Sequence, residues 1–243
     1  LIPGKRGRKV GGFQILEDGR YYGCCVCIGA AGVGIFAKHA IIENNGCVVV
    51  NFYEQGENEI TTERGKISIK TETKYPADGK IKLKIASECD FCLKLRIPEW
   101  SKNQKDTAKD GYAVYKIRAG ESEIEIELDM SIRTTLPEKW DLDVLYIDTC
   151  GTRRPPVPVR HYPEDDNYIS LSRGPIPLAA DSSLGKDAKS TFSFKNYDYR
   201  ICEDENHTVK LEFTAENGEK FYLIDYGTAG KDWESDIAAW LPV

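Results

Sequence analysis

The sequence predicts a mainly β protein, in which a single helix precedes one or two antiparallel β-sandwich units. Three observations lead to this prediction. Apolar and charged residues alternate with a period of two along residues 66–75, 80–85, 91–97 and 123–130, as expected for strands with one buried face. These short runs follow one another closely, with turn residues such as Asp78-Gly79 between them. Hydrophobic residues make up 41% of the 243 residues, enough for a substantial core.

The first 46 residues are expected to be mainly irregular or helical. Residues 1–23 are basic and glycine-rich, which indicates irregular structure. Residues 28–43 predict one helix of small residues, whose glycines weaken it intrinsically unless it packs tightly against other helices. Asn44-Asn45-Gly46 is expected to end this helix with a turn.

The strand pattern begins after this turn. Residues 47–53 read as a buried strand, and the alternating runs follow it. A proline-rich stretch at 150–167 predicts a linker or long surface loop. Strand patterns resume at 168–171, 208–215 and 220–226. We therefore predict a first sandwich unit at 47–133, and a linker with a second sandwich unit at 134–243.

Charge and composition exclude several classes of protein. The net charge is −6, from 39 acidic and 33 basic side chains, which argues against nucleic acid or an anionic membrane surface as the main partner. No apolar run approaches the roughly 18 residues of a membrane span. The chain starts with Leu1 and contains one methionine, Met130, and we expect it to be a piece of a longer protein.

The chain has eight cysteines, of which three crowd together at Cys24, Cys25 and Cys27. The other five, at positions 47, 89, 92, 150 and 202, fit as small apolar residues of strands and strand ends. We expect a reduced chain. Reduced cysteines favour the cytoplasm over the periplasm, although the sequence does not decide the compartment.

The cysteine cluster is the constellation with the reactivity for catalysis or metal binding. Cys24 and Cys25 lie just before the expected helix, whose dipole favours a thiolate at its N-terminus. Adjacent cysteines differ from the two-residue gap of a zinc knuckle, but both can contact one metal where the backbone turns sharply. The alternative is that three small side chains are buried at a tight helix start.

Other candidate groups have simpler explanations. His39, His161 and His207 are far apart in the sequence, and we interpret them as solvated or core histidines. Trp100, Trp140 and Trp233 could stack on sugars, but packing onto the core is the commoner use of such residues.

Several stretches, taken in order, resemble one family: the glycoside hydrolases related to bacterial β-L-arabinofuranosidase (GH127, long known as DUF1680). Each stretch is weak alone, but the ordered set extends from about residue 20 onward. The matching pieces are Cys24-Cys25 before a glycine-rich helix, and residues 48–53, 73–79, 93–100, 171–178, 225–233 and 239–242.

This resemblance implies a large (α/α)₆ barrel that carries the active site, followed by β-sandwich domains. Residues 1–46 would then be the end of the barrel. By resemblance, Cys24 is the zinc-bound nucleophile and Cys25 is its adjacent zinc ligand. The family's other zinc ligands, a glutamate and a cysteine, and its acid/base glutamate have no counterpart here. Family members often follow the cysteine pair with prolines, whereas this chain has Val26-Cys27.

The resemblance implies the C-terminal segment of a retaining glycoside hydrolase acting on L-arabinofuranosides or related plant glycans. We expect this segment to be inactive and to bind little or no zinc by itself. The alternatives are a non-catalytic β-sandwich module that binds carbohydrate or serves as a scaffold, and a disulfide-linked surface adhesin. The apolar residues of the 28–43 helix, including Ile35, Phe36, Ile41 and Ile42, need a cover. The sandwich surface or a second copy could supply it, and we favour a homodimer.

Overall fold

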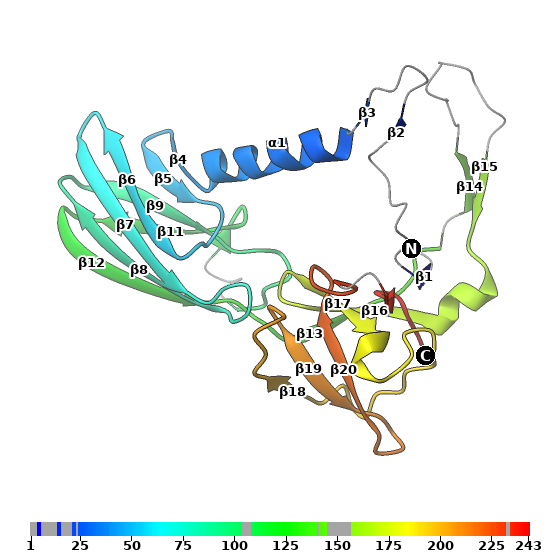
Figure 1. Cartoon of the computed structure of the whole chain (residues 1–243). Helices are drawn as coiled ribbons and strands as arrows, with labels where there is room; N and C mark the ends of the chain where they lie inside the picture. Colours follow the sequence, from blue (N-terminus) through cyan, green and yellow to red (C-terminus); the bar gives the residue numbers. More distant parts are fainter. Residues whose placement is uncertain are drawn as a thin grey trace. The chain divides into compact units, whose positions relative to one another are not determined.

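A computed structural model describes residues 4–5, 14–15, 21–22, 24–103, 108–139, 141–144, 157–231 and 234–243. The chain divides into two compact units, one formed by Arg8–Ser131 and the other by Leu1–Gly7 with Ile132–Val243. Within the described residues the fold is mainly β with one α-helix, α1 (Cys24–His39), which precedes the sandwich strands of the first unit (Figure 1). The predicted fold class is therefore confirmed. No described helix is long and apolar enough to cross a membrane.

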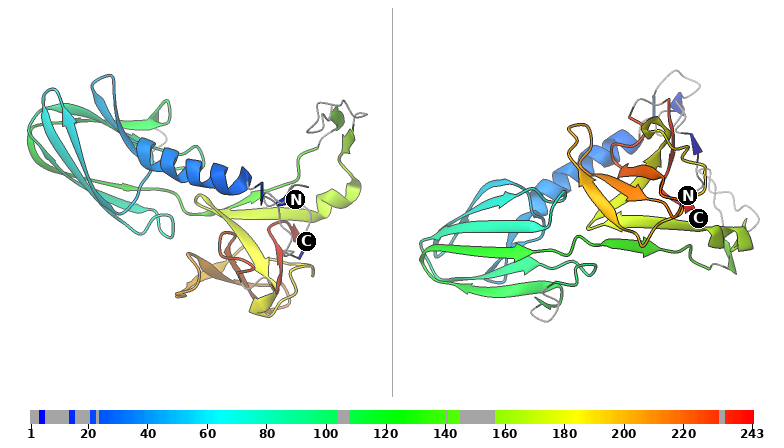
Figure 2. Two further views of the ribbon diagram at one scale, coloured as in Figure 1. Left: turned by 45° about the horizontal axis from the view of Figure 1, so that its top comes forward. Right: turned by 90° about the horizontal axis from the view of Figure 1, so that it is seen from below.

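The first unit is a β-sandwich of two sheets, which Figures 1 and 2 show as separate layers. One sheet has the order β10-β11-β9-β5-β4, with strands β4 (Ile41–Asn44), β5 (Cys47–Val50), β9 (Phe91–Arg96), β10 (Ala108–Lys109) and β11 (Tyr112–Ile117). The other has the order β12-β8-β7-β6, with strands β6 (Gly56–Thr62), β7 (Gly65–Thr73), β8 (Lys80–Ser87) and β12 (Gly120–Glu127). Neighbouring strands are antiparallel, except that β5 and β9 are parallel.

The two sheets enclose one aliphatic core, as the alternating pattern predicts. Ile69 and Leu83 face the core from one sheet, and Val50 and Leu93 from the other, all of them fully buried. The opposite face of the β12-β8-β7-β6 sheet is charged, and Lys82 forms ion pairs there with two glutamates of β12. The strands at 66–75, 80–85, 91–97 and 123–130 are confirmed to within a few residues.

The predicted helix at 28–43 is wrong at both ends, because α1 starts at Cys24 and stops at His39. Residues Ile41–Asn44 instead form β4, which pairs with β5 in a hairpin. Asn45 and Gly46 have φ angles of 52° and 73°, the positive values that a two-residue hairpin turn requires. The β-branched side chain of Ile41 gains a paired strand and a place against the core, which favours the hairpin over a longer helix.

The second unit is built on a set of antiparallel strands. Its main path runs β1-β21-β17-β20-β19-β18, and β16 joins β17 to β13 and β22. Phe192, Phe213 and Phe221 are buried in its core. Its elements are β1 (Gly4–Lys5), β13 (Ile132–Thr135), η2 (Pro163–Asn167), β16 (Tyr168–Arg173), β17 (Ile176–Asp181), η3 (Ser182–Leu184), β18 (Tyr199–Cys202), β19 (Lys210–Thr214), β20 (Lys220–Asp225), β21 (Asp236–Ala238) and β22 (Leu241–Pro242).

The remaining short strands correct two expectations. β2 (Gln14–Ile15) pairs with β3 (Tyr21–Tyr22) inside the stretch expected to be irregular. β15 (Val157–Arg160) pairs with β14 (Asp141–Val144), so the 150–167 stretch is not wholly a linker or loop. Pro158 is tolerated there because a two-stranded ribbon has free edges, where a missing N–H breaks no ladder. Residues 145–156 lie outside the described part of the chain.

Gly79 is expected to be essential for closing the sandwich beside β8. A Cβ at this position would overlap the carbonyl oxygen of Leu128 and the side chain of Met130. The amide of Leu128 donates to the carbonyl of Gly79 at 2.9 Å, so the two segments cannot simply separate. We therefore expect Gly79→Ala to lower the free energy of unfolding by about 2–4 kcal/mol, measured by urea denaturation.

The matched control is Gly32→Ala in α1, where an added Cβ meets no atom within 4 Å. Because alanine is the better helix former, this variant should be neutral or more stable by up to about 1 kcal/mol. Unchanged stability in Gly79→Ala would contradict the close packing described above.

Candidate functional site

The cysteine pair named by the sequence lies in the first turn of α1. The backbone of Cys24 and Cys25 is helical, and Cys27 follows in the same turn. The side chains of these three cysteines lie outside the described part of the structure. The first turn of a helix lies at the positive end of its dipole, which in general favours the thiolate form of a cysteine there. Among the described residues, no group of three or more His, Cys, Asp and Glu side chains could hold a metal ion.

The far end of α1 is anchored to the sandwich. The amide of Asn51 donates to the carbonyl of Ala40 at 2.8 Å, and its Nδ2 donates to the carbonyl of His39 at 2.9 Å. The rings of Phe36 and Phe52 lie 4.5 Å apart between centroids. The helix surface between these anchors and Cys24 is open, since Val33 is 71% and Ile35 is 61% exposed. Ile41 and Ile42 are only half-exposed in β4, so the expectation that they form part of this surface is wrong.

Each of the other candidate residues that the structure describes makes its own local contacts. His39 bonds the carbonyl of Ile35 in its own helix, His161 contacts Asp166, and His207 contacts the hydroxyl of Thr228. Trp100 is half-buried and packs against the sandwich core, which favours a packing role over sugar stacking. Trp140 and Trp233 lie outside the described residues. The four described cysteines beyond α1, at positions 47, 89, 92 and 202, are free thiols.

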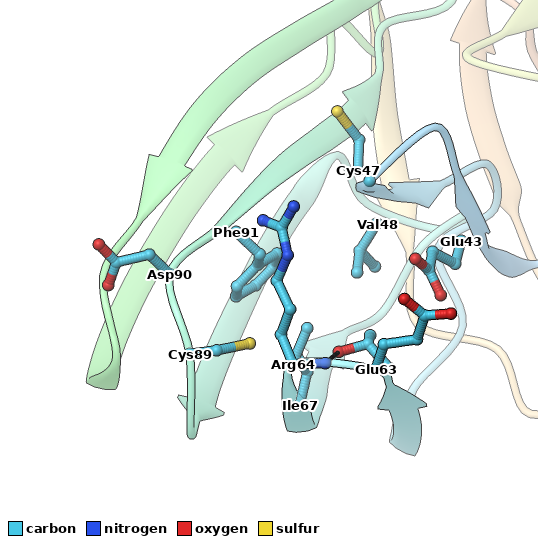
Figure 3. A pocket seen from close by; sticks show the side chains of 11 residues that line it. Glu43, Cys47, Val48, Glu63, Arg64, Ile67, Cys89, Asp90 and Phe91 are labelled. Atoms are coloured by element: carbon cyan, nitrogen blue, oxygen red, sulfur yellow. Dashed lines mark hydrogen bonds between the residues drawn. The ribbon is translucent and has the colours of Figure 1, made fainter.

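A pocket of about 230 Å³ at one end of the sandwich was not predicted (Figure 3). It is lined by the β4–β5 turn, the β6–β7 turn and the residues just before β9. The side chain of Arg64 extends past Phe91 toward Cys47, with the carboxylate of Glu63 on the other side of it. A guanidinium, carboxylates and an aromatic ring together can bind a small polar ligand. No motif marks this site, because its residues belong to separate turns.

Two buried carboxylates hold the turn region that contains one of the family-like stretches, 225–233. Asp225 accepts hydrogen bonds from the amides of Val209 and Thr228, both at 3.1 Å. Asp181 accepts from the amide of Gly230 at 2.7 Å, and it also accepts from Ser183. These hydrogen bonds lower the pKa of Asp181 despite the opposing effect of burial. The described residues of this stretch therefore serve the fold.

Glu212 is the centre of a charged cluster on the second unit. Its side chain is 9% exposed and accepts hydrogen bonds from Lys220 at 2.8 Å, Arg200 at 3.1 Å and the hydroxyl of Tyr222 at 3.1 Å. Hydrogen bonds from Lys220 and Arg200 lower the pKa of Glu212 to about 2. Its partners come from β18 and β20 on either side of β19, so only strand pairing brings them together. A carboxylate held as an anion by two cations is suited to stability rather than to proton transfer.

Comparison with known proteins finds one family model that matches the sandwich. Residues 47–131 match the family model of the β-L-arabinofuranosidase GH127 middle domain. A comparison with curated proteins finds no match. The resemblance to β-L-arabinofuranosidase-like glycoside hydrolases, expected from the ordered motifs, is thus confirmed.

Solved structures share the fold over most of the chain. A GH127 β-L-arabinofuranosidase from Geobacillus stearothermophilus T6 matches with a TM-score of 0.65 at 16% identity, over 90% of this chain and 37% of that protein. A GH127 β-arabinofuranosidase matches with a TM-score of 0.66 at 19% identity, over 91% and 38%. A protein described as a glycoside hydrolase matches with a TM-score of 0.67 at 17% identity, over 90% and 39%. The chain therefore spans less than two fifths of the length of these relatives.

The low pKa of Glu212 predicts a pH-dependent contribution to stability. The ordinary value is 4.5 and the folded value is about 2, so the stabilisation is present above about pH 4.5 and is lost as the pH falls toward 2. We expect Glu212→Gln to reduce the difference in unfolding free energy between pH 7 and pH 3, measured by urea denaturation. Glu205→Gln, at an exposed carboxylate, is the matched control and should leave the difference unchanged. Equal pH dependence in all three proteins would contradict the assignment.

Proposed function

We propose that this chain is the C-terminal segment of a retaining glycoside hydrolase that acts on L-arabinofuranosides or related plant glycans. The observation that carries the proposal is that two features follow each other directly in the sequence. The sandwich at 47–131 that matches the GH127 middle domain directly follows a helix whose first turn contains Cys24-Cys25. These are the positions at which the family resemblance implies a nucleophile and its neighbour.

Cys24 is the proposed nucleophile. In a retaining mechanism its thiolate forms a C–S bond to the anomeric carbon while the bond to the leaving oxygen breaks, and a general acid protonates that oxygen. The conjugate base of that acid then accepts a proton from a water molecule, whose oxygen attacks the same carbon as the C–S bond breaks and the thiolate is released. The location of Cys24 at the N-terminus of a 16-residue helix supports this role, because the dipole stabilises the anion that attacks.

Cys25 is the proposed partner of Cys24 in holding a zinc ion. Thiolates suit zinc, and two of them in one helical turn provide half of a four-ligand shell. By the family resemblance, the other two ligands are a glutamate and a cysteine, which would come from elsewhere in a longer protein. When bound, the ion supplies positive charge that keeps the Cys24 thiol deprotonated.

The same reasoning implies that the chain by itself is inactive. The resemblance leaves the acid/base glutamate and two zinc ligands without counterparts here. General-acid assistance to the leaving group contributes typically about 10²–10⁴-fold. The solved relatives are more than twice as long as this chain, which gives room for a separate catalytic domain.

A second candidate function is carbohydrate binding without catalysis, which the pocket beside Arg64 favours. Its volume of about 230 Å³ is of the order of a single sugar unit, and its lining combines carboxylates with a guanidinium. Saturable binding of an arabino-oligosaccharide that Arg64→Ala abolishes, in a longer protein without hydrolase activity, would favour this role over the first.

The main proposal is tested in the longer protein that the upstream coding sequence specifies. That sequence should encode a helical barrel with an acid/base glutamate and a Glu–Cys pair for zinc. Cys24→Ser should then lower kcat/KM on an aryl arabinofuranoside by about 10³-fold or more, since it removes the nucleophile. Cys27→Ser is the matched control in the same turn and should stay within about threefold of the parent. Unrelated upstream sequence, or equal activity in both variants, would refute the proposal.

The isolated 243-residue chain is expected neither to hydrolyse arabinofuranosides nor to hold stoichiometric zinc. The reason is that two thiolates fall short of the roughly four ligands that tight zinc binding needs. Turnover of an aryl arabinofuranoside and metal content by mass spectrometry measure the two properties on one purified sample. Turnover that Cys24→Ser abolishes would show that the missing groups lie within this chain.

A further inference from the structure

Cys47 and Cys92 lie side by side on adjacent strands of the first sandwich sheet. Cys47 is the first residue of β5, and it is the direct register partner of Cys92 in the parallel ladder with β9. The next pair, Val48 and Leu93, is fully buried and faces the core. Because side chains alternate along a strand, both thiols therefore project from the other face of the sheet.

The two thiols interact within a partly open environment. Both cysteines are half-buried, and both are free. Burial raises the pKa of Cys92, and a hydrogen bond with the Cys47 thiol raises it further. Lys94 and Lys116 lie close enough to oppose this shift. Lys116 is the register neighbour of Cys92 on β11. The lysines provide positive charge beside any thiolate that forms.

The strand geometry allows a bond between these sulfurs. Adjacent strands are about 4.8 Å apart, which falls within the Cα separations of about 4.4–6.8 Å that disulfides span. A bond across neighbouring strands must draw the two Cβ atoms closer than the strand spacing, because Cβ atoms of a disulfide are typically about 3.8 Å apart. Such strain raises the reduction potential of a disulfide, so that thiols reduce it more easily than an unstrained structural disulfide.

We propose that Cys47 and Cys92 form a reversible dithiol site that low-molecular-weight disulfides such as glutathione disulfide oxidise to an intramolecular disulfide. One thiolate attacks a glutathione sulfur, forming a mixed disulfide and releasing one glutathione thiolate. The second cysteine attacks the protein sulfur of the mixed disulfide and releases the second glutathione. Overall, the two cysteines lose two protons and two electrons, and one glutathione disulfide becomes two glutathione thiols.

Oxidation at this site would tie β5 covalently to β9, the middle strand of the same sheet. β5 links the β4 hairpin to β9, and Asn51 at its end carries the anchors of α1. The disulfide would thus link β5, which is followed by the helix anchor Asn51, to β9, which lies more than 40 residues later in the chain. It uses neither Cys24 nor Cys25, and it is independent of the proposed hydrolase activity.

The test equilibrates the full chain at pH 8 in glutathione buffers of increasing oxidised fraction, then blocks free thiols and maps linked peptides by mass spectrometry. We expect the Cys47–Cys92 link to dominate in the most oxidising buffer and to disappear on return to excess reduced glutathione. In the chain unfolded in urea, the eight cysteines compete as partners, so the fraction linking Cys47 to Cys92 should fall by about tenfold or more.

Single substitutions complete the experiment. Cys47→Ser should abolish the link and leave Cys92 as a free thiol or a glutathione adduct. Cys89→Ser is the matched control, because Cys89 is a free thiol two residues before β9 and should leave the link intact. Cys47→Ala provides a second test in case the serine variant is poorly folded. Absence of the link in the folded chain, accumulation of glutathione adducts alone, or equal yields in folded and unfolded chains would each overturn the proposal.

Discussion

Strand β5 enters the sandwich between β4 and β9, and its parallel pairing with β9 is the contact on which the rest of the first unit depends. Four consecutive residues, Cys47–Val50, pair with the segment 92–95. Between β5 and β9 the chain leaves this sheet, forms β6, β7 and β8 in the other sheet, and then returns. It also places Val48 and Val50 in the core. Since parallel neighbours need a long crossover, three strands of the second sheet, β6, β7 and β8, form the connection.

The support of α1 follows from the same strand. Asn51, directly after β5, bonds two carbonyls at the end of the helix, and its Oδ1 accepts from the hydroxyl of Tyr112 at 2.8 Å. The helix is 16 residues long, so its first turn stands about 22 Å from this anchor along the helix axis. The proposed nucleophile, Cys24, therefore belongs to a helical turn far along the helix axis from the anchor at Asn51. This arrangement suits a sandwich that supports a site rather than containing it.

Charged residues in the described parts of the chain mostly stabilise strands and turns. The ion pairs of Lys82 and Lys84 lie on the outer face of their sheet, where solvent weakens each of them. Asp181, Asp225 and Glu212 are more buried, and each is satisfied by amides, hydroxyls or cations of its own unit. Among the described residues discussed above, the reactive or charged groups to which we assign no stabilising role are the free thiols and Arg64 at the end of the sandwich.

The alternating pattern was sufficient to predict β7, β8, β9 and β12 of the first unit and the class of the fold, because burying one face of a sheet demands that period. It was also sufficient, through ordered motifs, to indicate the family and to single out Cys24-Cys25. Local pattern failed at Asn45-Gly46, where the same residues can end a helix or turn a hairpin. Pairing of β4 with β5 decided between them. The pattern also did not predict β6, because this strand lies at a sheet edge and its polar sequence shows little alternation.

The tertiary structure alone decided which distant residues meet. Cys47 and Cys92 become neighbours only through a crossover that contains three strands of the other sheet, β6, β7 and β8. The Glu212 cluster gathers side chains from three strands, and the Arg64 pocket gathers three separate turns. Periodicity reports which side of a strand is buried, and it carries no information about the strand beside it. The sequence by itself therefore determined the class of the fold and the candidate nucleophile, while strand order and register determined every site built from more than one segment.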